Sequence, residues 1–224
     1  MKKFGSAFKK NPPDKASKKS TPSVFVIESL SEENEKEDCF EGSFLRSFLR
    51  LSGKDVDYIY IRTARELEHA LNLFQASNKR YLHLSCHANK NEIGLTLDSL
   101  SLADFARYAA PYLNNRRLFL SACEVTTLKL AREIFAEQSG CHSIIGFGDS
   151  PDIRDAALMW TTFYHEIFKD DPDKMSRVRI NGVLESLAKF FKVKLQHYYP
   201  KPEEQVTRVT FGPTGKKQPK SYKL

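Results

Sequence analysis

Two residues that can do nucleophilic chemistry each end an apolar segment of the sequence. His87 ends residues 80–87, and Cys123 ends residues 116–123. An imidazole can take the proton of a thiol, the thiolate can attack an acyl carbon, and the imidazolium can then protonate the leaving amine. Both side chains would meet at one edge of a sheet if the two segments are neighbouring parallel strands, roughly 4.8 Å apart. The alternative is that Cys123 is a small core residue and His87 a structural one.

The elements that must position these residues alternate between strands and helices. Short apolar segments predict six strands, at 23–30, 56–61, 80–87, 116–123, 142–147 and 205–211. Apolar residues at helical spacing predict helices at 35–51, from 63 onwards, and at 101–112, 126–138, 152–168 and 179–192. We interpret the aromatic residues of these helices as core. Such βαβ units form an α/β three-layer sandwich, with a mainly parallel six-stranded sheet between helices on both faces.

The composition excludes several classes of protein. A chain of 224 residues, 41% of them hydrophobic, suits one domain with a substantial core. No apolar run approaches the roughly 18 residues of a membrane-spanning helix, and the N-terminus lacks the apolar stretch of a secretory signal. The four cysteines include no CxxC pair, which argues against a disulfide framework. We therefore expect a soluble cytoplasmic protein.

The positive charge of the chain lies at its two ends. The net charge is +7, of which residues 1–22 contribute +6 and residues 213–224 contribute +4, so the body between them carries −3. A groove for nucleic acid needs its basic residues on the folded body. We therefore predict a folded domain at 23–212 between two basic, disordered tails, which would bind nucleic acid or anionic lipid only weakly.

The sequence motifs around both reactive residues resemble those of one family. The first segment is HLSCHA at 83–88 and the second is LFLSAC at 118–123, and further matches lie at 140–146 (GCHSIIG), 155–157 (DAA), 163–164 (FY) and 209–212 (VTFG). This sequence resembles the CHAT branch of the caspase-like cysteine proteases, which typically has an apolar strand ending in His-Gly and a second ending in Ser-Ala-Cys. The resemblance covers roughly residues 80–170 well and the flanks loosely.

The resemblance implies a caspase-like fold and a cysteine endopeptidase that needs no metal or cofactor. His87 would be the general base and Cys123 the nucleophile. The oxyanion hole would use the backbone N–H groups of Cys123 and of Ala88, which stands where the family usually has glycine. The resemblance further implies a protein or peptide substrate. It also implies a regulated effector, switched on by a separate sensor or activator protein in a bacterial stress or antiviral defence pathway.

The loop at 148–152 carries the residues expected to select the substrate. In the wider fold group, acidic residues after the fifth strand often shape the pocket for the residue before the scissile bond. Asp149 and Asp152 can each accept Arg or Lys in a charge-assisted pair. Asp152 can instead cap the helix that follows, so Asp149 is the better candidate for this role.

Two further interpretations compete with a protease. Ala88 and Glu124 depart from the patterns of the family and of caspases, and they favour a catalytically inactive module that binds a partner protein. Zinc is suggested by a cluster of possible ligands, which are His83, Cys86, His87, Cys123, Cys141 and His142. Alternate residues of a strand point to opposite faces, so Cys86 cannot easily join His83 and His87, and we expect no metal site.

Overall fold

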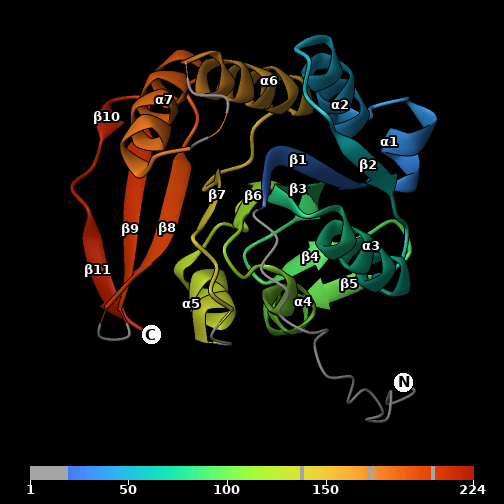
Figure 1. Ribbon diagram of the computed structural model, residues 1–224, viewed down its shortest axis with the longest axis horizontal. Coiled ribbons are helices and arrows are strands. Elements are labelled where there is room, and N and C mark those ends of the chain that lie inside the picture. The colour runs from blue at the N-terminus through green and yellow to red at the C-terminus, as the bar shows by residue number, and fades with distance from the viewer. Residues whose placement is uncertain (1–19, 137–138, 171–172, 174, 203–204) are drawn as a thin grey trace.

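The computed structural model describes residues 20–136, 139–170, 173, 175–202 and 205–224. Five parallel strands form its centre in the order β2-β1-β3-β6-β7. They are β1 (Thr21–Ser29), β2 (Asp57–Tyr60), β3 (Lys79–Ala88), β6 (Arg117–Ser121) and β7 (Ser143–Phe147). This mainly parallel sheet, with helices on both faces, confirms the predicted α/β class (Figure 1).

The C-terminal part of the chain extends the sheet with antiparallel strands. They are β8 (Leu195–Lys201), β9 (Gln205–Gly212), β10 (Gly215–Lys216) and β11 (Lys220–Lys223). The chain from residue 213, which the sequence analysis assigns to a tail, instead forms β10 and β11 on the outer edge of β9. At the other end, residues 21 and 22 belong to β1 rather than to a tail. The sheet of the described residues therefore has eleven strands, not six, because β4 (Glu92–Gly94) and β5 (Ser99–Ser101) also join it.

Two helical layers cover the sheet and enclose two cores. One face carries α2 (Glu41–Leu51), α6 (Ile153–Asp170) and α7 (Arg177–Phe190), which Figure 1 shows along the top. The other face carries α3 (Ala64–Ser77), α4 (Leu102–Ala109) with a short 3-10 turn (Ala110–Tyr112), and α5 (Leu128–Ala136). Trp160, Phe163 and Tyr164 of α6 are fully buried against Phe119 of β6, which confirms that the aromatic stripe is core.

The helix predicted at 35–51 is divided into two. α1 (Glu32–Lys36) ends before Asp38, whose φ of 57° lies in the left-handed region, and α2 begins at Glu41. A residue in this conformation stops a right-handed helix. The ring of Phe40 packs edge-on against Tyr60 of β2, 5.4 Å between centroids, and holds the turn to the sheet. The break lets α1 lie beyond the end of β1 while α2 packs on the sheet.

A helix that spans a membrane needs about 20 predominantly apolar residues. No helix in the described part of the chain combines enough length with enough apolar character to cross a bilayer.

Candidate active site

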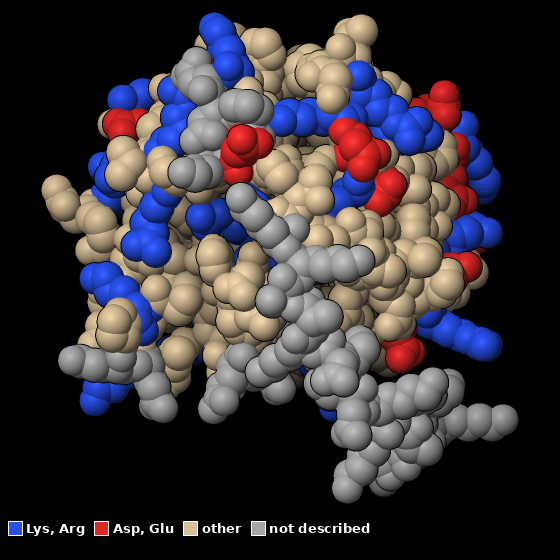
Figure 2. Space-filling model, in the orientation of Figure 1, with Lys and Arg blue, Asp and Glu red and all other residues tan. Residues whose placement is uncertain are grey.

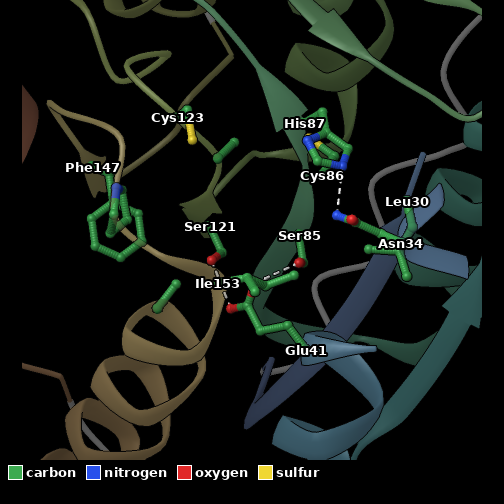
Figure 3. A pocket seen from close by; sticks show the side chains of 13 residues that line it. Leu30, Asn34, Glu41, Ser85, Cys86, His87, Ser121, Cys123, Phe147 and Ile153 are labelled. Atoms are coloured by element: carbon green, nitrogen blue, oxygen red, sulfur yellow. Dashed lines mark hydrogen bonds between the residues drawn. The ribbon is translucent and has the colours of Figure 1, made fainter. Parts of the chain in front are cut away.

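The parallel pairing of β3 with β6 brings His87 and Cys123 to one edge of the sheet. Ser85 lies opposite Ser121, and the same register continued by two residues sets His87 beside Cys123. Alternate residues of a strand share a face, so both side chains lie on the face covered by α2 and α6. His87 is exposed and Cys123 is half-buried. Both line a cleft of about 110 Å³ (Figure 3).

Asn34 of α1 holds the imidazole of His87. The side-chain amide nitrogen of Asn34 lies 3.0 Å from Nε2 of His87, and in Figure 3 the other ring nitrogen is on the side of Cys123. The two orientations of this amide give opposite tautomers of the ring. With Oδ1 of Asn34 facing the ring, the amide accepts the Nε2–H, and Nδ1 is left unprotonated on the side of the thiol.

The backbone N–H of Ala88 points away from β4, which pairs with the end of β3. Asn89 N–H donates to the carbonyl of Glu92 at 3.0 Å, so Ala88 and Ile93 form the next pair along the ladder. Hydrogen-bonded and non-bonded pairs alternate between antiparallel strands. Ala88 is therefore in a non-bonded pair, and its N–H is directed to the opposite side.

That opposite side is the side of Cys123. The turn after β4 lies against β1, because Thr96 N–H donates to Oγ of Ser29 at 3.1 Å. The N–H of Ala88 thus faces the β6 side of the strand. Ala88 is not among the described residues with positive φ, so the alanine needs none of the conformational freedom of glycine here.

The chain turns sharply after Cys123. Glu124 has a φ of 52°, and its N–H donates to the carbonyl of Asp149 at 2.9 Å. Its carboxylate reaches across the rim of the cleft to Lys90, with an Nζ–Oε1 distance of 3.3 Å. This turn ties the loop after Cys123 to the loops that follow β3 and β7.

A buried carboxylate lies at the base of the cleft. Glu41, the first residue of α2, is 6% exposed and accepts hydrogen bonds from Oγ of Ser85 at 2.8 Å and from Oγ of Ser121 at 2.6 Å (Figure 3). Burial raises the pKa of Glu41 to about 7, although the two hydroxyl groups oppose this shift. Glu28 of β1 lies next to it in the same buried region, where it accepts from the N–H groups of Gly42 and Ser43.

The position of Glu41 on its helix indicates from the sequence that this acid is buried. Glu41, Leu45 and Leu49 occupy positions i, i+4 and i+8 of one helix, and all three are buried. An acid on the apolar stripe of a helix needs polar partners inside the protein. Ser85 and Ser121, each two residues before a reactive residue, are those partners.

Neither acid of the loop at 148–152 is among the residues that line the cleft. The carboxylate of Asp149 accepts the backbone N–H of Lys194 at 2.6 Å. The carboxylate of Asp152 caps α6 by accepting the backbone N–H of Arg154 at 2.9 Å, and it also pairs with the guanidinium of Arg154. The cleft is instead lined from this loop by Pro151.

The residues considered for zinc lie apart. His83 is buried and its Nδ1 is 3.1 Å from the hydroxyl of Tyr164, and burial lowers the pKa of His83 to about 3. Cys86 packs in the core on the opposite face of the sheet. In the described part of the chain, no group of three or more His, Cys, Asp or Glu is placed to hold a metal ion.

Comparisons with known proteins bear on the fold. No protein family and no curated protein matches this sequence. Among solved structures, a secreted C11 cysteine protease of Bacteroides thetaiotaomicron, iotapain, superimposes with a TM-score of 0.51 at 12% identity, covering 80% of this chain. This chain spans 66% of the length of that protease. Caspase-1 of Spodoptera frugiperda has a TM-score of 0.48 at 9% identity, covering 96% of this chain and 93% of its own. The likeness to the C11 protease shows a caspase-like fold, which is the fold that the sequence resemblance implies.

Proposed function

We propose that this protein is a cysteine endopeptidase in which Cys123 is the nucleophile and His87 the general base. The observation that supports this function is the open cleft at the carboxyl ends of β3 and β6, lined by both side chains, with Asn34 against the imidazole. A nucleophile, a base and a third group that orients the base are the usual parts of such a site. Catalytic groups of open parallel sheets gather at this edge.

The reaction uses groups that the site already holds. The imidazole takes the proton of Sγ, and the thiolate attacks the carbonyl carbon of the peptide bond. The resulting oxyanion accepts hydrogen bonds from the backbone N–H groups of Ala88 and Cys123. The imidazolium then protonates the leaving amine, which leaves a thioester on Cys123. A water molecule, deprotonated by His87, hydrolyses the thioester and frees the enzyme.

The substrate class that fits this cleft is a peptide with Arg or Lys before the scissile bond. Glu41 is the only acidic residue that lines the cleft as described, and Phe147 and Ile153 supply apolar walls for an alkyl stem. A cation near Glu41 lowers its pKa and favours the ionised carboxylate. Asp149 and Asp152, which are predicted from the sequence to bind the basic residue before the scissile bond, remain candidates for that role. Substitution of each acid in turn can distinguish their contribution from that of Glu41. The CHAT subtype, the activator protein and a role in defence remain predictions from the sequence resemblance.

Iodoacetamide is expected to modify Cys123 at least about tenfold faster than the other three cysteines. Cys39 is the matched comparison, because it is also half-buried and unpaired. Burial raises the pKa of the Cys86 thiol and raises that of Cys141 to about 12, so both should react slowly. Mass spectrometry of each peptide gives the four rates, and His87→Ala should abolish the difference. Equally slow labelling of all four thiols would favour the inactive, partner-binding module.

Asn34→Ala is expected to lower kcat by about 10- to 100-fold with little change in KM, because the imidazole loses the group that orients it. Asn34→Asp supplies an acceptor oxygen at the same place and should restore most of the activity. Steady-state kinetics on one peptide substrate separates the two parameters. A loss in both variants, or a change confined to KM, would argue against an orienting role for Asn34.

A further inference from the structure

A second and larger cavity lies at the other end of the sheet. It has a volume of about 500 Å³, within the range of small-molecule sites. Arg117 at the start of β6, His142 just before β7 and Arg177 at the start of α7 all line it. Arg117 and Cys123 are six residues apart along β6 and its continuation, which is about 20 Å of extended chain. A ligand here would therefore not compete with a peptide in the catalytic cleft.

The ionisable side chains among the described lining residues of this cavity are all basic, and the α-carboxylate of Leu224 is the one acidic group among those residues. No Asp or Glu is among its described lining residues. Arg117 donates to Oγ of Ser143 at 2.7 Å and to the carbonyl of Met175 at 3.0 Å, and both acceptors are neutral. Arg177 lies over the ring of Tyr199, 3.8 Å from its centroid. Neither guanidinium has an acidic partner among the described residues.

A third arginine contributes to the positive electrostatic potential at this cavity. Among the described residues, Arg80 at the start of β3 donates to neutral oxygens, including the backbone carbonyls of Ser20 and Asp173. Burial, together with Arg117, Arg80 and Arg177, lowers the pKa of His142. Lys and Arg side chains also gather over α7 and β8–β11, on the left of the face drawn in Figure 2, with few acidic side chains among them.

We propose that this cavity binds a phosphate group, either free or as part of a small phosphate ester such as a nucleotide. Arginine is the residue best suited to phosphate, because its planar guanidinium presents paired N–H donors to two oxygens. Arg177 is also the first residue of α7, so the positive end of that helix faces the same region. An anion would offset the repulsion between these positively charged side chains.

Binding to the full chain tests this site. Inorganic phosphate, adenosine 5′-monophosphate and adenosine are titrated by calorimetry at an ionic strength held constant with chloride. Saturable binding of phosphate and of the monophosphate, with none of adenosine, is expected. A monophosphate that binds at least tenfold tighter than phosphate would identify a phosphate ester as the ligand, and equal affinities would identify the free anion.

Three variants locate the binding. Arg177→Gln, which removes the contact with the Tyr199 ring, should weaken phosphate binding at least tenfold, and His142→Gln should weaken it to a smaller extent. Arg65→Gln, an exposed arginine of α3 outside the cavity, is the matched control and should bind as the unaltered protein does. No saturable binding of either phosphate compound, or binding unchanged in both Arg177→Gln and His142→Gln, would overturn the proposal. The outcome does not depend on whether the protein cleaves peptides.

Discussion

Cys123→Ala is expected to lower the kcat/KM of peptide cleavage by at least about 10³-fold, the scale seen when a nucleophile is removed from a triad. His87→Ala should have a similar effect, because the imidazole acts only through the thiol. The double variant should be no worse than either single one, since residues that act as a unit do not add. A peptide library, with any candidate activator present, supplies the substrate for these measurements.

The control for this series is Cys39→Ala, which removes the other half-buried thiol. That variant should cleave as fast as the unaltered protein. Cleavage that survives Cys123→Ala would place the chemistry elsewhere. No cleavage by the unaltered protein with any activator tried would favour the partner-binding module.

Glu41→Gln is expected to lower kcat/KM by about 10²-fold or more for peptides with Arg or Lys before the scissile bond. The reason is that the cation would be buried opposite a neutral amide, and breaking a desolvated pair costs about 3–5 kcal/mol. Peptides with a neutral residue at that position should change by less than about threefold. The fold should tolerate this change, because the hydroxyl groups of Ser85 and Ser121 can donate or accept.

The pH dependence gives a second readout of the same residue. Burial raises the pKa of Glu41 to about 7, and an acid is ionised above its pKa. The kcat/KM for an Arg peptide should therefore rise through about pH 7 relative to that for a neutral peptide, and Glu41→Gln should remove this difference. Asp149→Asn is the competing variant. If it removes the preference for Arg and Glu41→Gln does not, the acid of the loop selects the substrate.

The sequence predicts the strands that carry His87 and Cys123 because both are apolar, short and bounded by polar residues. Buried parallel strands are the elements with the clearest pattern. The sequence does not predict β8, whose residues 195–201 include Gln196, His197 and Pro200. These residues belong to the sheet because of their neighbours in the fold, since β8 pairs with both β7 and β9. His197 is buried with its Nδ1 hydrogen-bonded to Oδ1 of Asn181 at 2.8 Å.

The same distinction applies to the candidate site. The pair His87 and Cys123 follows from strand ends alone. Asn34 and Glu41 reach the cleft because the helix breaks at Asp38 and α1 and α2 then take separate directions. The spacing of apolar residues in the sequence does not predict this break. Asp152, by contrast, has the cap role that its position before a helix favours.

The short strand at the end of the described chain has a consequence for self-association. Without β10 and β11, the outer side of β9 would present a row of unpaired backbone groups, and such a row invites pairing with a second molecule. β11 has only four residues, and two of them are the exposed lysines Lys220 and Lys223. Lys220 and Lys223, in a segment whose composition is typical of a solubilising tail, therefore disfavour edge-to-edge pairing of the sheet with that of a second copy.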